Sequence, residues 1–207
     1  MNKLPVDKKT VNPLPVTPPP VPKVYDTDKV ENGLLAEYEN LFKTIKNNKL
    51  NILEVGVYKG GSLLWAKDYF PNSNINGMDI VLPKKPLEGI TLFIGNQNDD
   101  DRLKDVAKKC GGPLDIIIDD GCHKRNETFN TFNQLWKYVR PGGWYVIEDW
   151  VAGFWEEYPE YAGLVEMVQK IVKARSNFGI SDVQLIIKDE KCSYAALRKA
   201  KNRGFSI

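Results

Sequence analysis

Short apolar runs alternate along the chain with segments whose apolar residues recur at helical spacing. The runs predict strands that are buried on both faces, and the spaced segments predict amphipathic helices. The predicted strands cover residues 50–57, 75–80, 90–95, 114–119 and 143–149. The predicted helices cover residues 31–47, 100–112, 126–139 and 160–175. A further helix is predicted between Ser62, which would cap it, and Phe70, near which it would stop.

The last part of the sequence has a different pattern. Residues 182–189 and 193–199 are two strand-like runs with a short polar turn between them, which predicts a β-hairpin. Strands that alternate with helices are typical of a parallel sheet covered by helices on both faces. The predicted fold is therefore doubly wound α/β, with a mostly parallel, seven-stranded, Rossmann-like sheet. The antiparallel terminal hairpin is expected to place one antiparallel strand at the edge.

The first 22 residues stand apart from this pattern. They contain seven prolines, no aromatic residue and no apolar periodicity. Proline fixes φ and removes backbone donors, so residues 1–22 are expected to be an extended, disordered tail, and residues 23–207 a single domain. A spacer is favoured over a docking ligand for a proline-binding partner. The tail is also similar to spacers in proteins of large algal viruses.

Composition excludes several classes of partner. The 29 basic and 27 acidic residues nearly balance, which argues against a nucleic-acid partner or a membrane surface. No apolar run reaches the roughly 18 residues of a membrane span, and the first residues lack the apolar core of a secretory signal. The three cysteines form no paired framework, so we expect reduced thiols and a cytoplasmic location. The sequence leaves a homo-oligomer open.

Polar and glycine residues follow the first three predicted strands. In open α/β sheets, ligands lie beyond the carboxyl ends of the strands. Glycines there admit a ligand to the backbone, and an acid after the second strand is placed to accept hydrogen bonds from ribose hydroxyls. The spacing of the glycines is not that of a dinucleotide fingerprint. The predicted nucleotide-like site comprises Glu54, Gly56 and Gly60 after the first strand, Asp79 after the second, and Gln97 and Asn98 after the third, with the amides facing an adenine edge.

Two pairs of acids follow the fourth and fifth strands. Asp119 and Asp120 close one strand, and Glu148 and Asp149 close the next. Because neighbouring parallel strands end side by side, these carboxylates are expected to crowd onto one rim, where a divalent cation would relieve their repulsion. Oxygen ligands favour Mg²⁺ or Mn²⁺ over zinc.

The motifs ILEVGVYKGGS, GMDI, IIIDDGCH and VRPGGWYVIED resemble those of class I S-adenosylmethionine-dependent methyltransferases. More narrowly, they resemble the metal-dependent sugar O-methyltransferases of macrolide pathways, over residues 25–207. The stretch TDK at 27–29 is similar to a cofactor-proximal stretch of that family, but the histidine that often follows it there is absent here.

The resemblance implies roles for particular residues. It places S-adenosylmethionine against the nucleotide-like site, with Tyr58, Ser62 and Asp119 as further contacts. It implies that the metal ligands are Asp120, Glu148 and Asp149, and that His123 is the general base beside Asp120. An imidazole there could take the proton from a sugar hydroxyl as that hydroxyl attacks the sulfonium methyl group.

Aromatic residues follow the second acid pair directly. Aromatic faces stack on the C–H faces of sugars, although packing in the core accounts for such residues equally well. The set consists of Trp150, Phe154, Trp155, Tyr158 and Tyr161.

Together these features predict a Mg²⁺-assisted O-methyltransferase that acts on a sugar hydroxyl of a glycan or glycosylated metabolite. Two alternatives stay open at the level of sequence. One is a catechol-type O-methyltransferase, which would use a similar metal site on a phenol. The other is a non-catalytic S-adenosylmethionine-binding module, although such a module needs neither the acid cluster nor His123.

Overall fold

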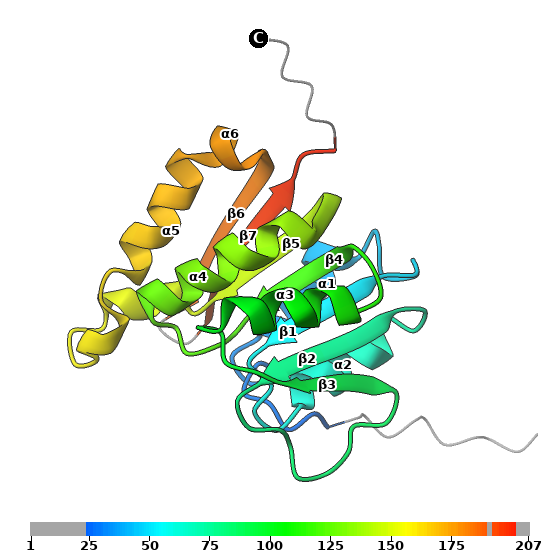
Figure 1. Ribbon diagram of the computed structural model, residues 1–207. Coiled ribbons are helices and arrows are strands. Elements are labelled where there is room, and N and C mark those ends of the chain that lie inside the picture. Colours follow the sequence, from blue (N-terminus) through cyan, green and yellow to red (C-terminus); the bar gives the residue numbers. More distant parts are fainter. Residues whose placement is uncertain (1–23, 190–191, 202–207) are drawn as a thin grey trace, which may run out of the picture.

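Seven strands form one sheet in the order β3-β2-β1-β4-β5-β7-β6 (Figure 1). The computed structural model describes residues 24–189 and 192–201. The predicted tail and the boundary after residue 22 lie outside these ranges. Strands β1 to β5 are mutually parallel, and the strand order reverses between β1 and β4. The predicted doubly wound, mostly parallel sheet is confirmed.

The strands and helices occupy the segments that the apolar pattern indicated, with shifts of a few residues at most ends. The strands are β1 (Asn51–Val55), β2 (Asn74–Asp79), β3 (Ile90–Ile94), β4 (Leu114–Asp119), β5 (Val139–Glu148), β6 (Ile180–Asp189) and β7 (Cys192–Lys199). The α-helices are α1 (Leu34–Phe42), α2 (Gly61–Tyr69), α3 (Asp100–Lys109), α4 (Arg125–Leu135), α5 (Leu164–Lys173) and α6 (Arg175–Phe178). Short 3₁₀ segments cover Trp136–Tyr138, Trp150–Phe154 and Pro159–Tyr161.

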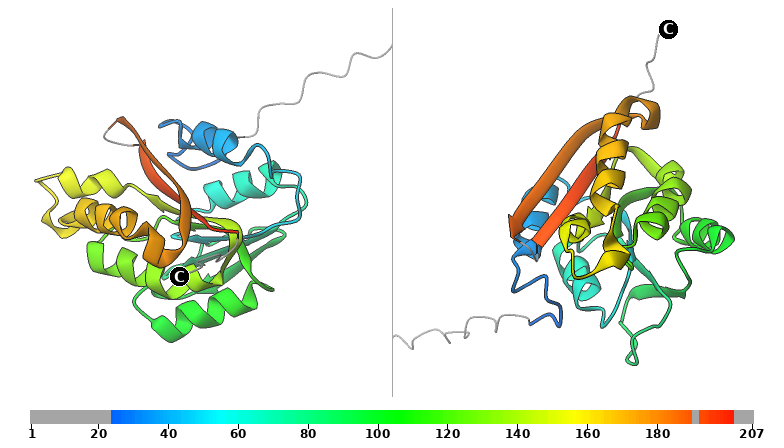
Figure 2. Two further views of the ribbon diagram at one scale, coloured as in Figure 1. Left: turned by 90° about the horizontal axis from the view of Figure 1, so that it is seen from above. Right: turned by 90° about the vertical axis from the view of Figure 1, so that its left-hand side faces the viewer.

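Helices cover both faces of the sheet (Figures 1 and 2). One core joins α3, α4 and α5 to side chains such as Leu53 and Ile117. The other core joins α1 and α2 to the alternate side chains of the same strands, such as Ile52 and Ile116. Because successive strand residues point to opposite faces, an unbroken apolar run supplies both cores at once.

The terminal hairpin differs from the prediction in its place in the sheet. Strand β7 is antiparallel to both β5 and β6 and lies between them, so the antiparallel strand is internal and β6 forms the edge. The later strand of the hairpin, β7, pairs with β5, and the earlier strand, β6, pairs only with β7. The buried pattern of β7 fits this inner position, because only an inner strand has partners on both sides.

Two local predictions were wrong. Ser62 does not cap α2, because Gly60 is the N-cap residue and the Ser62 hydroxyl donates to Glu54 instead. The fifth strand begins at Val139 and not at Gly143, because Val139 already pairs with Leu114, so Pro141 and Gly142 lie within β5. The register shifts between Leu114 and Ile116, and this irregularity accommodates Pro141, which has no amide donor.

Among the described residues, no helix has the length and apolar character needed to span a bilayer.

Candidate active site

The chain passes close to itself where the strand order reverses. Gly56 follows β1 with φ +92°, and a β-carbon built on it would lie 1.8 Å from the backbone oxygen of Asp120, which follows β4. The sequence predicted that this glycine admits a ligand. The structure shows that the missing side chain at Gly56 makes room for the backbone that follows β4. This close approach brings Asp120 to the switch point of the sheet.

A cavity of about 1100 Å³ opens at this switch point. It extends over the carboxyl ends of β1, β2 and β3, which is where a nucleotide-like ligand is expected. Five of the predicted cofactor residues line it: Gly56, Tyr58, Asp79, Gln97 and Asn98. The apolar residues Ile80, Val81, Leu82 and Leu87 add a wall that composition and spacing did not indicate.

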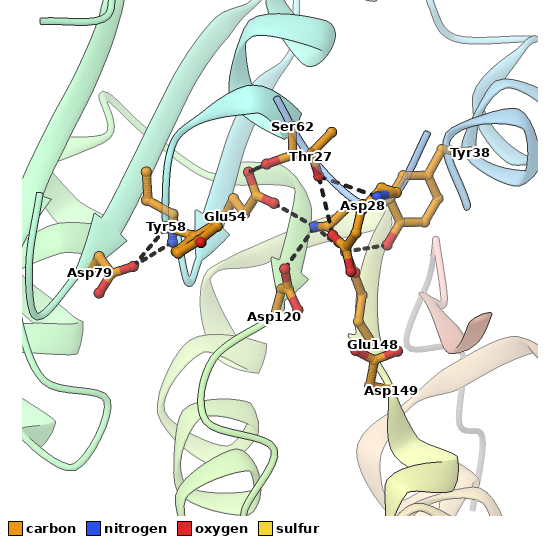
Figure 3. A network of polar contacts seen from close by, with 12 residues as sticks. Thr27, Asp28, Tyr38, Glu54, Tyr58, Ser62, Asp79, Asp120, Glu148 and Asp149 are labelled. Atoms are coloured by element: carbon orange, nitrogen blue, oxygen red, sulfur yellow. Dashed lines mark hydrogen bonds and ion pairs between the residues drawn. The ribbon is translucent and has the colours of Figure 1, made fainter. Parts of the chain in front are cut away.

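Asp79 holds the turn after β1, whose residue Tyr58 lines this cavity. Its Oδ2 atom accepts hydrogen bonds from the amides of Val57 at 2.7 Å and Tyr58 at 3.0 Å (Figure 3). Its Oδ1 atom accepts a hydrogen bond from the Val81 amide at 3.2 Å. Each carboxylate oxygen has two lone pairs, so Oδ2 is fully used and Oδ1 keeps one lone pair for a donor on a ligand while the group fixes the turn.

Gln97 is also part of the scaffold. Its Oε1 atom accepts a hydrogen bond from the Cys122 amide, and its Nε2 atom donates to the Thr131 hydroxyl. The side chain thereby holds the turn after β4 against α4. Asn98 is exposed at the mouth of the cavity.

A second cavity of about 800 Å³ adjoins the first. Asp26, Tyr58, Lys59 and Asp120 line both cavities, so the two meet at these residues. The predicted residues Gly60 and Ser62 line the second cavity rather than the first, together with His123, Glu148 and Asp149. Glu54 and Asp119 line neither cavity.

Four carboxyl groups do meet on one rim, but they are not the four that the sequence predicted. Asp119 turns away, accepts a hydrogen bond from the Tyr145 hydroxyl at 2.8 Å and is only 2% exposed. Its place is taken by Glu54, which reaches the rim from β1 (Figure 3). The cluster therefore consists of Glu54, Asp120, Glu148 and Asp149.

The inner half of the cluster surrounds a lysine. The ammonium group of Lys29 lies 2.8 Å from one oxygen each of Glu54, Asp120 and Glu148. Tyr38 donates a second hydrogen bond, of 2.6 Å, to the same Glu148 oxygen. Lys29 is the last residue of the TDK stretch, and the family resemblance of that stretch was the signal that could have led to it.

The pKa values of this cluster depart from their usual ranges, and burial is the largest cause for its carboxyl groups. Burial acts to lower the pKa of Lys29, but the attraction of Asp120, Glu148 and Glu54 outweighs it, and the pKa lies well above its usual value. Burial, followed by repulsion from Asp120, raises the pKa of Glu148 well above its ordinary range despite Lys29. Burial also raises the pKa of Asp149 to about 6. A further positive charge beside Glu148 and Asp149 would lower both pKa values again.

The outer half of the cluster faces the second cavity. His123 Nε2 lies 3.5 Å from Asp120 Oδ1 and 3.9 Å from Asp149 Oδ2. Within the described part of the chain, Tyr58, His123 and Asp149 are the non-glycine residues with positive φ, between 48° and 55°, and all three line this cavity. Left-handed backbone at such residues costs free energy, and it gathers at functional sites.

The donor set suits a hard divalent cation. Ligand atoms of Asp120, His123 and Asp149 lie within 4.8 Å of one another, and so do those of Glu54, Asp120 and Glu148. The second group already surrounds the Lys29 ammonium. The two carboxylates of the outer group suit Mg²⁺ or Mn²⁺, whereas an imidazole is a more usual ligand for zinc, copper or iron, so His123 would lie beside such an ion without binding it. The Oε1 atom of Glu148 is held by Lys29 and Tyr38, which leaves Oε2 to contribute.

The aromatic residues after β5 lie in three different environments. Trp150 is 5% exposed and packs in the core. Trp155, Tyr158 and Tyr161 contact one another, with ring centroids 5.9–6.1 Å apart, and Tyr161 packs edge-on against His123 at 6.4 Å. Phe154 is 63% exposed. Tyr161 thus adjoins the imidazole with the rings of Trp155 and Tyr158 packed on it, and none of the five aromatic residues lines either cavity.

No protein-family model matches the chain, but individual proteins do. The mycinamicin VI 2''-O-methyltransferase of Micromonospora griseorubida is 39% identical over 127 residues, which are 57% of this chain and 31% of that protein. The demethylmacrocin O-methyltransferase of Streptomyces fradiae is 37% identical over 126 residues, or 57% of this chain and 32% of that protein. The uncharacterized protein R132 of Acanthamoeba polyphaga mimivirus is 27% identical over 130 residues, or 56% and 59% of the two chains.

Solved structures agree with these matches. The MycE methyltransferase of the mycinamycin pathway, in complex with Mg and SAH, matches with a TM-score of 0.68 at 28% identity, over 82% of this chain and 50% of that one. The chain is thus similar to part of known O-methyltransferases in sequence and in structure. A further MycE structure contains Mg, SAH and mycinamycin VI, and matches with a TM-score of 0.66.

The relationship also confirms the predicted fold class. An O-methyltransferase from Bacillus cereus in complex with SAH matches with a TM-score of 0.57 at 16% identity, which supports the class I methyltransferase fold alone. The chain spans about half the length of MycE and about a third of the two curated relatives from bacteria. What those longer proteins bind and modify therefore bears on this chain only as a basis for a proposal.

Proposed function

We propose that this chain is an S-adenosylmethionine-dependent, Mg²⁺-assisted O-methyltransferase that methylates a sugar hydroxyl of a glycan or glycosylated metabolite. The observation that carries the proposal is that Asp120 lines both cavities and lies beside His123. A methyl donor in the first cavity and an acceptor in the second would meet at this residue. The relatives add support, because one of them is a methyltransferase of a rhamnosyl tetracenomycin and the structure of MycE contains Mg, SAH and mycinamycin VI.

The first cavity would hold the methyl donor. Its position beyond β1, β2 and β3 matches that of a nucleoside ligand, and Asp79 would accept hydrogen bonds from the ribose hydroxyls. Gln97 and Asn98 would border the adenine, and Tyr58 would lie at the junction of the two cavities. Glu54 and Asp119 would act on this site indirectly, since neither lines the cavity.

The second cavity would hold the acceptor. When bound, a divalent cation supplies positive charge that lowers the pKa of the acceptor hydroxyl and fixes its position. Asp120 and Asp149 would hold that ion, with Glu148 behind them. His123 would take the hydroxyl proton as the oxygen forms a bond to the methyl carbon and the carbon–sulfur bond breaks. The products would be the methyl ether, neutral S-adenosylhomocysteine and a protonated imidazole.

The lining of the second cavity favours a sugar over a phenol. Most of its residues are polar or charged, including Thr27, Asp28, Glu31 and Asn32 on the acceptor side. Such groups exchange hydrogen bonds with several hydroxyls at once, whereas a catechol ring requires apolar walls. The aromatic residues next to His123 extend the surface on which the rest of a glycan could lie.

A direct assay tests the proposal. The full chain is incubated with S-adenosylmethionine, Mg²⁺ and either a panel of glycosides or a catechol, and products are followed by mass spectrometry. We expect a gain of one methyl group on a glycoside, abolished by chelator and restored by added Mg²⁺. Methylation of the catechol alone would identify a phenolic enzyme. Cofactor binding without turnover of any acceptor would indicate a binding module.

A further inference from the structure

Lys29 has an unusual environment for a lysine. It is 4% exposed, and its ammonium group has three donors, each of which can meet one of the three carboxylate oxygens that lie 2.8 Å away. The partners come from the ends of β1, β4 and β5. A single buried cation thus joins three strands of the sheet at their carboxyl ends.

Lys29 also anchors the segment that carries it. Residues 24–33, which we call the strap, run from the start of the described chain to α1 and line the second cavity. Two further polar contacts of the strap are exposed: Asp26 pairs with Lys59 at 3.1 Å, and the Tyr25 hydroxyl donates to Asp68. A β-carbon on Gly61 would meet the Asp26 carbonyl, so the strap passes directly over the start of α2.

The two oxygens of Asp120 face different partners. Oδ2 contacts the Lys29 ammonium at 2.8 Å, and Oδ1 faces His123 at 3.5 Å. The ammonium therefore fixes the orientation of the carboxylate that is common to both cavities. It also stands where a cation would otherwise sit among Glu54, Asp120 and Glu148.

We propose that Lys29 is the resident cation of the acid cluster and a positioning residue for it. Its ammonium holds Glu54, Glu148 and one oxygen of Asp120, anchors the strap over the second cavity and leaves the outer side of Asp120 to a divalent ion. The mention of a divalent ion rests on the proposed function. The roles of the ammonium in charge balance and in holding the strap do not.

A double-mutant cycle tests whether Lys29 acts through its charge. Removing one partner of a buried ion pair leaves the others uncompensated, so Lys29→Met should reduce the folding equilibrium constant at least about 100-fold. Glu54→Gln should then recover about tenfold or more in the Lys29→Met background, because it removes one of the repelling charges. In the wild-type background the same change should give no gain. Urea unfolding in the absence of metal measures the folding equilibrium constants of the wild type, the two single variants and the double variant.

Lys104→Met is the matched control. It also removes a lysine that pairs with a carboxylate, Asp101 at 3.1 Å, but this pair is exposed, and the change should cost less than about fivefold. If Glu54→Gln has the same effect in both backgrounds, the charge role of Lys29 is refuted. If Lys29→Met does not fold, the double variant is expected to fold, and its failure to do so would also overturn the proposal.

Two further measurements address the strap and the cation. Amide hydrogen exchange in residues 24–33 should be faster in Lys29→Met than in Lys104→Met, and equal rates would show that the strap has another anchor. Mn²⁺ titration, followed by electron paramagnetic resonance, should give at least about tenfold tighter binding or a second ion in Lys29→Met, because the ammonium no longer opposes the ion. Unchanged or weaker Mn²⁺ binding by folded Lys29→Met would contradict the resident-cation role.

None of these measurements uses a methyl acceptor or S-adenosylmethionine. A chain that methylates no sugar could still give every expected result. Failure of the proposed function and failure of this inference are therefore distinguishable.

Discussion

Gly56→Ala should be among the most damaging single-methyl additions in this protein, and its cost can be divided into two parts. Left-handed backbone costs an L-residue about 1–2 kcal/mol relative to glycine. In addition, the new β-carbon would lie 1.8 Å from the Asp120 backbone oxygen, which no side-chain rotation can relieve. Forcing apart two packed segments costs about 1–3 kcal/mol, so the sum is about 2–5 kcal/mol.

Gly111→Ala isolates the first part. Gly111 has φ +88°, close to the +92° of Gly56, but a β-carbon there would meet no atom within 4 Å. Gly111→Ala should therefore lower the free energy of unfolding only by the cost of the left-handed backbone, about 1–2 kcal/mol. The difference between the two variants measures the contact between the ends of β1 and β4.

Thermal unfolding and calorimetry with S-adenosylhomocysteine check this reasoning. In a domain of this size each kcal/mol lowers the midpoint by roughly 2–4 °C, so Gly56→Ala should melt below Gly111→Ala by several degrees. Gly56→Ala should also weaken cofactor binding, because relief of the clash displaces Asp120, whereas Gly111→Ala should bind normally. Equal melting temperatures for the two variants, or normal cofactor affinity in Gly56→Ala, would refute the account of Gly56.

The remaining predictions concern the two cavities. Asp79→Ala should weaken S-adenosylhomocysteine binding about tenfold by calorimetry, since it removes ribose acceptors and releases the turn at Val57 and Tyr58, and an unchanged affinity would remove Asp79 from the site. Saturating Mg²⁺ should raise the melting temperature of the wild type, since at 100 times the Kd binding adds about 2.7 kcal/mol to the free energy of unfolding. Asp149→Asn should abolish this rise. An equal rise in both proteins would show that the ion binds elsewhere. His123→Ala should lower kcat about 10²–10⁴-fold with little change in cofactor affinity, and near-normal turnover would show that another group takes the proton. Burial raises the pKa of Asp119 from 3.8 to about 7, so the folded state binds this proton more tightly than the unfolded state does, and the resulting stability is lost as pH rises from about 4 to 7. Asp119→Asn should flatten that part of the stability–pH curve, and identical slopes in urea titrations of the two proteins would contradict the shift.

Local patterns in the sequence were sufficient for most of the architecture. Unbroken apolar runs predicted the buried parallel strands, because a strand covered on both faces needs apolar side chains at every position. Helical spacing predicted the helices for a similar reason, since one apolar stripe must face the sheet. Both are properties of consecutive residues, and the structure confirms them within a few residues at most ends.

The same kind of pattern predicted which residues would be near the site, but not what each one contacts. Asp120 and His123 were placed together correctly, because they are three positions apart in one turn. Asp119 was expected on the rim with its neighbour, but successive residues at a strand end point to opposite sides, and it bonds to Tyr145 in the core. Glu54 was expected at the cofactor and instead joins the acid cluster.

Only the tertiary structure determined which residues Lys29 contacts and why position 56 requires a glycine. Lys29 is 25 residues from Glu54 and 119 from Glu148, and it meets both because β1 and β5 flank β4. Gly56 meets Asp120 because the order of the sheet places the ends of β1 and β4 side by side. Apolar periodicity specifies which face of each element is buried, but strand order is set by how all the elements pack together. Contacts across neighbouring strands therefore cannot be derived from any one segment of the sequence.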